Sequence, residues 1–200
     1  MSNLPKVKTR LSGSSGVSVR EMSLSDLPAI YSLGERLFPA DKWPTLYRTW
    51  DEYELATLFA SDRETCLVAE LDNSVVGFAL GTLLEKRGSA WNYGYLLWLG
   101  VDESIARKGV AARLFERITD IFIKLGARMI MVDTDADNEV ALSFFRSQGF
   151  GHESPHLFLS RNLSNDPDYI RHRNLPRSAV ARKRSVSPNR LNYVHAYKDE

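Results

Sequence analysis

Residues 97–112 read LWLGVDESIARKGVAA, and this stretch decides the fold. An apolar strand ends at Val101, a short charged loop follows, and a helix opens with small residues. The first N–H groups of a helix have no intrahelical acceptor and lie at the positive end of its dipole, so small side chains there let an anion approach. The spacing of a P-loop and the GxGxxG of dinucleotide-binding folds are both absent. The residues that we expect to hold a phosphate are Arg107, Lys108, Gly109, Val110, Ala111 and Ala112.

Strand and helix patterns continue outward from this stretch on both sides. Apolar residues alternate in some segments and recur at helical spacing in others. They predict the order β-α-α-β-β-β-α-β-α-β, an α/β fold with a mixed, mostly antiparallel sheet flanked by helices. Asp72-Asn73 predicts the turn of a hairpin. The expected strands are 17–22, 66–72, 75–84, 92–101, 128–133 and 156–161, and the expected helices are 26–37, 45–59, 108–125 and 138–148.

The two ends differ from the middle in composition. Residues 1–16 are polar and rich in Gly and Ser, which is typical of a disordered leader. Residues 163–200 are predicted to form an extended or disordered basic tail. Residues 162–200 carry a local net charge of +4, which leaves −3 for residues 1–161. A solvated tail and an anion-binding patch are both possible interpretations of this segment. The folded domain is expected over residues 17–162.

The overall composition excludes several classes of protein. Of the 200 residues, 44% are hydrophobic, and the net charge of +1 argues against a dedicated nucleic-acid binder. We expect nucleic acid as a partner only through the basic tail. The sequence has no run of 18 apolar residues and no apolar stretch behind its first basic residues, so we expect neither a membrane span nor a secretory signal. A single cysteine, Cys66, fits a reducing compartment, and we expect a cytoplasmic protein.

Two stretches, at a fairly specific spacing along the sequence, resemble the signatures of the GNAT acyltransferase superfamily. After Val101 and four intervening residues, the segment 106–111 reads ARKGVA, close to (Arg/Gln)-x-x-Gly-x-(Gly/Ala). About 27 residues later, NEVALSFFRSQGF at 138–150 resembles Asn-x-x-Ala-x-x-(Leu/Phe)-Tyr-x-x-x-Gly-Phe. The resemblance covers residues 17–162. It implies a splayed sheet, acetyl-CoA as cofactor with CoA as product, and an N-acetyltransferase that passes an acetyl group directly to a primary amine.

The resemblance also implies where the cofactor lies. The strand ending at Val101 would splay from the strand that ends before Asp133, and the pantetheine arm would lie between them. The backbone of Leu99 and Val101 would bond this arm, and the pyrophosphate would sit on the N–H groups of residues 107–112. Asn138 would bond the arm and Phe145 would lie near the thioester sulfur. The cofactor-binding residues implied are Leu99, Gly100, Val101, Arg107, Lys108, Gly109, Val110, Ala111, Ala112, Asn138 and Phe145.

Two positions depart from the family pattern. Ala106 replaces the Arg or Gln that opens the first signature, and Phe145 replaces the tyrosine that often protonates the departing thiolate. General acid catalysis contributes about 10²–10⁴ in rate, although a thiol with a pKa near 8.5 also leaves without help. Water, Tyr95 or Tyr93 are the alternatives. A non-catalytic acyl-CoA-binding sensor or interaction module therefore stays open as a second function.

The resemblance points to two catalytic candidates. An amine must lose a proton before it attacks a thioester, so a base or a water chain is needed. Asp133 matches the position of an acid used as base in some relatives, and a solvated acidic loop with Asp135 and Asp137 is the alternative. Tyr95 sits where other relatives carry a catalytic acid, and strand packing is its alternative. These aspartates lack the glycine and glutamate of a calcium loop, so no metal is expected.

The acceptor is expected to bind at the first two helices and the connector between them. Phe38, Trp43 and Tyr47 are the predicted substrate-binding residues, with core packing as the alternative for each. Nearby acids favour a cationic acceptor, either a protein N-terminus or lysine, or a small amine. Cys66 lies within a predicted strand, so we expect a buried thiol and no covalent route. The oligomeric state stays open, a homodimer included.

Overall fold

The computed structural model describes most of the chain from Gly16 to Arg173. The chain divides into two compact units, residues 1–155 and residues 156–200. Within the described residues, no helix is long and apolar enough to cross a membrane. The described ranges are 16–39, 49–85, 91–154 and 161–173.

Five strands of the first unit form one sheet, with the strand order β1-β2-β3-β4-β5. Neighbours are antiparallel from β1 to β4, and β5 pairs with β4 in parallel. A parallel neighbour requires a crossover connection, which helix α3 supplies. The predicted mixed, mostly antiparallel sheet is confirmed. The strands are β1 (Ser18–Glu21), β2 (Cys66–Leu71), β3 (Ser74–Glu85), β4 (Asn92–Val101) and β5 (Ala127–Met131).

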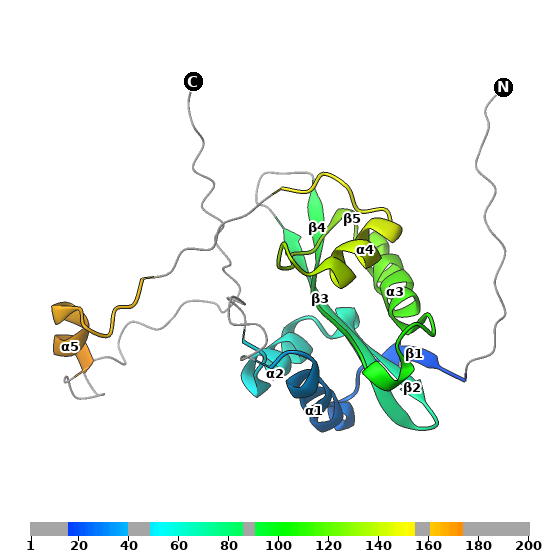
Figure 1. Cartoon of the computed structure of the whole chain (residues 1–200), viewed down its shortest axis with the longest axis horizontal. Helices are drawn as coiled ribbons and strands as arrows, with labels where there is room; N and C mark the ends of the chain where they lie inside the picture. Colours follow the sequence, from blue (N-terminus) through cyan, green and yellow to red (C-terminus); the bar gives the residue numbers. More distant parts are fainter. Residues whose placement is uncertain (1–15, 40–48, 86–90, 155–160, 174–200) are drawn as a thin grey trace, which may run out of the picture. The chain divides into compact units, whose positions relative to one another are not determined.

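Helices cover both faces of this sheet, as Figure 1 shows for α1 and α2 on one side and α3 on the other. Three short 3₁₀ helices connect the larger elements. The helices of the first unit are α1 (Leu27–Leu37), α2 (Glu52–Ser61), α3 (Val110–Lys124) and α4 (Glu139–Ser147). The 3₁₀ helices are η1 (Leu24–Asp26), η2 (Arg63–Thr65) and η3 (Glu103–Ile105).

The sheet separates two hydrophobic clusters. The cluster on the α3 face centres on Leu114, Ile118 and Phe122 of α3, and side chains of α4 pack against it. The other cluster joins α1 and α2 to the opposite face through Ile30, Leu55 and other buried residues. This division follows from the strands, because successive side chains of a strand point to opposite faces.

Two glycines of the central strands let α3 approach the sheet. A Cβ at Gly94 would lie 2.4 Å from the ring of Phe122, and a Cβ at Gly81 would lie 2.7 Å from the same ring. Phe122 therefore occupies the space that two side chains would need, and it has no exposed surface. This contact fixes the distance between α3 and β4.

The hairpin turn was predicted correctly. Asp72 and Asn73 have φ angles of 49° and 62°, as the two central residues of a type I′ turn require. β2 and β3 pair on either side of this turn, with Leu71 opposite Ser74.

Two predicted helix starts were wrong. The second helix begins at Glu52, because Asp51 has extended backbone and its side chain accepts from the Glu54 N–H at 2.7 Å; the predicted start at residue 45 lies outside the described residues. The third helix begins at Val110 and not at 108, because Gly109 has a φ of 75°, which lies outside the helical region. In both cases a local capping geometry overrides the apolar spacing.

Two predictions concerned the C-terminal residues, a last strand and an extended or disordered tail. The predicted last strand, 156–161, lies outside the described residues except for Arg161, which is not in a strand. The second unit contains a helix of seven residues, α5 (Pro167–Arg173), within the segment that we expected to be extended. Apolar spacing was too sparse there to reveal a helix of two turns.

Candidate functional site

Strand β4 leaves strand β5 halfway along its length. The last parallel pair is Tyr95 with Met131, and β4 continues for six more residues to Val101. At about 3.3 Å per residue, this half of β4 runs for about 20 Å beside no strand on its β5 side, within the part of the chain that the structure describes. The pairing therefore ends directly after Tyr95, where β5 itself ends at Met131, as the predicted splay requires.

A bulge in β4 lies at the point where the strands separate. Leu80 of β3 pairs with Trp98 and Gly81 pairs with Leu96, so Leu97 is an extra residue. A bulge bends the strand that carries it and increases its twist. Leu97, which the sequence alone did not reveal, therefore bends β4 just beyond its last pair with β5.

The bulge also reverses which side chains face which helices. Gly94 and Leu96 face α3, whereas Trp98 belongs to the cluster under α1 and α2. Leu99 and Val101 in turn pack against the α3 cluster. The backbone of this half of β4, including Gly100, carries the amide groups that the cofactor arm is expected to bond.

The loop at residues 106–109 leads into the start of α3. Arg107 and Gly109 both have positive φ angles, 67° and 75°, and Ala106, Lys108 and these two residues are exposed. Successive residues of alternating handedness form a concave array of N–H groups that suits anions. A Cβ at Gly109 would meet nothing within 4 Å, so the space in front of the helix start is open.

The first turn of α3 presents unused N–H groups to the same space. The first helical hydrogen bond runs from the Arg113 N–H to the Gly109 carbonyl at 3.1 Å. The N–H groups of Val110, Ala111 and Ala112 precede this bond and have no intrahelical acceptor. Within the predicted segment 107–112, the N–H groups of Val110, Ala111 and Ala112 remain for an anion, whereas the Lys108 N–H donates to the Ile105 carbonyl at 3.4 Å.

The two catalytic candidates are in direct contact. The Tyr95 hydroxyl donates a hydrogen bond to Oδ1 of Asp133. Tyr95 is buried, with 2% of its surface exposed, and Asp133 is exposed. A buried hydroxyl therefore holds an accessible carboxylate.

Sheet register explains why these two side chains meet. Ile130 and Val132 pack against the α3 cluster, so Met131 and Asp133 belong to the opposite face. Tyr95 is the partner of Met131 and shares that face. Asp133 lies two residues beyond this last pair, at the fork where β4 leaves β5, and the long tyrosine side chain reaches it.

Asn138 and Phe145 have structural partners in α4. Asn138 is the N-cap of this helix, and its Oδ1 accepts from the Ala141 N–H at 3.1 Å. Phe145 is half-buried, and its ring lies 5.3 Å from those of both Phe144 and Phe150. The cap role of Asn138 was missed, although an asparagine before a helix is a recognisable signal.

Phe38 belongs to an aromatic cluster under α1. Its ring lies 4.9 Å from Trp98 and 6.0 Å from Trp50, and Trp50 stacks on Phe78 at 5.1 Å. Phe38 thus packs against the core, which was the alternative interpretation. The other predicted substrate-binding residues, Trp43 and Tyr47, lie outside the described residues.

Acidic side chains line the α2 side of the same sheet face. Glu54 Oε1 accepts from the Trp98 indole at 3.2 Å, and Asp62 Oδ1 accepts from the Thr82 hydroxyl at 2.7 Å. Thr82 is the cross-strand partner of Tyr95. Asp62 therefore lies on the same face as the Tyr95–Asp133 pair. Helix α2 contains Glu52 and Glu54 and no basic residue.

Cys66 has no access to this site. It has no exposed surface, and burial raises the pKa of its thiol to about 12. A thiol of that kind stays protonated and unreactive near neutral pH.

Comparison with known proteins assigns the family. Residues 29–150 match the Acetyltransferase (GNAT) family. This match spans more than half of the chain, and the chain belongs to the GNAT acetyltransferase family.

Solved structures share the fold. An aminoglycoside acetyltransferase from an uncultured soil metagenomic sample, solved with sisomicin, has a TM-score of 0.58 and 24% identity over 73% of this chain and 97% of its own. The aminoglycoside N-acetyltransferase AAC(6')-Iy, solved with CoA, has a TM-score of 0.61 and 19% identity over 76% of this chain and 99% of its own. Ard1 from Thermoplasma volcanium has a TM-score of 0.58 and 21% identity over 70% of this chain and 86% of its own.

The cofactor of this family is acetyl-CoA, and the residues present fit it. The open cradle at the start of α3 suits a pyrophosphate, which carries two negative charges. The half of β4 beyond Tyr95 offers strand backbone to the amide-containing arm. The fork at Tyr95 and Asp133 places polar groups at the end of the gap farthest from the cradle.

Proposed function

We propose that this protein transfers an acetyl group from acetyl-CoA to a cationic primary amine in a ternary complex. The observation that carries the proposal is the Tyr95–Asp133 hydrogen bond at the fork of the splayed strands. The phosphate cradle lies at one end of the gap and an exposed carboxylate lies at the other. This arrangement suits a thioester held between them.

The roles of the residues follow from their surroundings. Acetyl-CoA supplies, when bound, a thioester carbonyl that an amine can attack. An amine with a pKa near 10 is protonated at neutral pH and must lose a proton first. Asp133 is the exposed carboxylate that accepts this proton, and the Tyr95 hydroxyl fixes the orientation of that carboxylate. Tyr95 is also the nearby hydroxyl that can protonate the departing sulfur, since Phe145 has none.

The acidic α2 side of the sheet face supports a cationic acceptor. Glu54 and Asp62 are half-buried and lie on the face that carries Tyr95 and Asp133. A positively charged amine is attracted to such a surface, and a second cationic group on the acceptor would gain further. Small polyamines, lysine side chains and basic N-terminal peptides share this chemistry.

The first test is thermal unfolding with and without acetyl-CoA. A ligand at 100 times its Kd adds about 2.7 kcal/mol, or about 5–10 °C for a domain of this size. We expect this shift with acetyl-CoA and CoA and none with ATP at equal concentration. The absence of any shift at millimolar acetyl-CoA would remove the proposal.

The second test separates an enzyme from a non-catalytic acyl-CoA sensor. Phe145 and Ala106, which depart from the family pattern, favour the sensor. A panel of amines is screened for release of the CoA thiol. We expect Asp133→Asn to lower kcat by about 10²–10⁴-fold and to leave the Kd of CoA unchanged, with a smaller loss for Tyr95→Phe. Binding of acetyl-CoA without turnover of any amine would favour the sensor.

A further inference from the structure

The last turn of α1 follows the second half of β4 closely. The ring of Phe38 lies 4.9 Å from that of Trp98. A Cβ at Gly100 would lie 2.8 Å from Leu37 Cδ1, so these two residues are in close contact. α1 therefore covers one face of the half-strand whose backbone is proposed to bind the cofactor arm.

Arg36, which precedes Leu37 in α1, connects this helix to Asp102 at the end of β4. Arg36 donates from Nη2 to Oδ2 of Asp102 at 3.4 Å. The other oxygen, Oδ1, accepts from the Ser104 N–H at 2.9 Å and from the Ser104 hydroxyl at 2.7 Å. These contacts, the Ser104 hydroxyl first, lower the pKa of Asp102, so it is a carboxylate at neutral pH.

Asp102 is tied to the fold on both sides. Its N–H donates to the Val76 carbonyl of β3 at 2.9 Å, and its carbonyl accepts from the Ile105 N–H at 3.1 Å. Ile105 is buried in the α3 cluster. Asp102 thus caps η3 at the point where β4 ends, four residues before Ala106, where the loop that leads into α3 begins.

We propose that Asp102 and Arg36 are positioning residues for the pyrophosphate-binding loop at residues 106–109. The inference rests on the proposed binding of CoA. Asp102 fixes η3 through Ser104, and Arg36 joins this cap to α1, the helix that leads toward the acceptor connector. The loop after η3 then holds its two positive-φ residues, Arg107 and Gly109, in the conformation that turns their N–H groups toward an anion.

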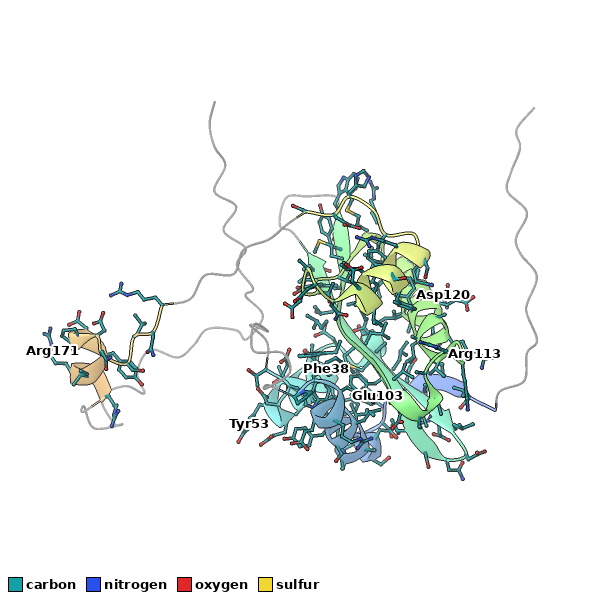
Figure 2. The ribbon with its side chains drawn as sticks, viewed as in Figure 1. Phe38, Tyr53, Glu103, Arg113, Asp120 and Arg171 are labelled. Carbon is teal, nitrogen blue, oxygen red and sulfur yellow. The ribbon has the colours of Figure 1, made fainter. Side chains whose placement is uncertain are left out.

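The charge of Asp102 makes this proposal easy to test. A carboxylate near a pyrophosphate repels it, so on charge alone the removal of Asp102 strengthens binding. If Asp102 positions the loop, its removal weakens the binding of CoA instead. Glu103 is the matched control, because it is the adjacent carboxylate, it is exposed, and Figure 2 shows it in the same loop.

The experiment measures the Kd of CoA by calorimetry in the full chain. Asp102→Ala removes the cap, and we expect about tenfold weaker binding; Asp102→Asn retains a capping oxygen and loses the partner of Arg36, and we expect about threefold. Arg36→Gln is expected to match Asp102→Asn. Glu103→Gln is expected to leave the Kd unchanged or slightly lower.

Pantetheine, which lacks the pyrophosphate, separates loop positioning from general damage. Its binding, followed by ligand-observed NMR, is expected to be equal in wild type and Asp102→Asn. Equal or tighter binding of CoA by both Asp102 variants overturns the proposal, and so does a matching loss of pantetheine binding. A wild-type chain that binds no CoA instead removes the proposed function, so the two failures are distinguishable.

Discussion

At the residue scale, the role of a side chain at or near the site depends on its surroundings. Asp133 is an exposed carboxylate held by a buried tyrosine. Cys66 shows the opposite case, because it is a nucleophile that burial keeps inert. Asp26 has a lowered pKa, mainly because Arg20 donates two hydrogen bonds to its carboxylate, and it secures η1 to β1. Each environment, and not the residue type alone, decides what the group can do.

Cys66 predicts a pH dependence of stability. Its pKa is raised from 9.0 to about 12, so above pH 9 the thiol ionises in the unfolded chain and not in the folded one. Stability therefore falls as the pH rises from 9 toward 12, by up to about 1.4 kcal/mol per pH unit from this residue. Urea unfolding between pH 8 and pH 10.5 checks this.

The control for this prediction is Cys66→Ala. This variant is less stable at pH 8 because it leaves a small cavity, but its stability should decline less steeply with pH than that of the wild type. Parallel curves for the two proteins would show that the thiol is not the cause.

At the element scale, the start of α3 depends on a conformation that only glycine adopts without strain. Gly109 has a φ of 75°, and Gly126, just beyond the other end of the same helix, has a φ of 83°. Alanine at either position should cost about 1–2 kcal/mol of stability. Only Gly109→Ala is expected to weaken CoA binding, since Gly126 is remote from the cradle. Equal Kd values for the two variants, measured by calorimetry, would contradict the assignment of the cradle.

The contact between α3 and β4 gives a second prediction at this scale. Gly94→Ala places a Cβ within 2.4 Å of the Phe122 ring, and we expect a loss of about 1–3 kcal/mol in the free energy of unfolding. Phe122→Leu removes the obstructing ring at the cost of a cavity. The double variant should be more stable than the sum of the two losses implies, and urea unfolding measures this coupling. Additive losses would show that the ring is not the obstacle.

Local signals explain which elements the sequence predicted correctly. Asp72-Asn73 and the apolar stripe of α3 act over a few neighbouring residues, so their patterns can be read directly. The bulge at Leu97 has no such pattern, because it depends on how β3 pairs with β4. The contact between Tyr95 and Asp133 depends in turn on that pairing and on the register of β5. The sequence suggested both residues through family resemblance, and their contact required the sheet.

At the scale of the whole molecule, charged residues of opposite sign lie on the two sides of the sheet. The α3 side carries the exposed basic loop at Arg107 and Lys108, and α2 on the other side is acidic. A polyanionic cofactor and a cationic acceptor are therefore attracted to different regions. Figure 2 shows Tyr53 projecting from α2, and 77% of its surface is exposed.

The C-terminal residues give the prediction at this scale. Residues 163–200 have a net charge of +4. Their deletion should leave the stabilisation by acetyl-CoA unchanged, because every proposed cofactor-binding residue precedes them. Retention on a nucleic-acid column at low salt should fall only if the tail is an anion-binding arm. A lost acetyl-CoA response would show that the tail supports the catalytic domain.

The bulge in β4 has a consequence for how a binding gap can arise. Side chains alternate between the two faces of a strand, and one extra residue shifts this alternation along the sequence. Without Leu97, Trp98 would follow Leu96 directly and would still face α1, so the extra residue changes the path of the strand and not the faces of the side chains that follow it. Deletion of that residue would therefore remove the bend from β4 and leave the side chains of both faces in place.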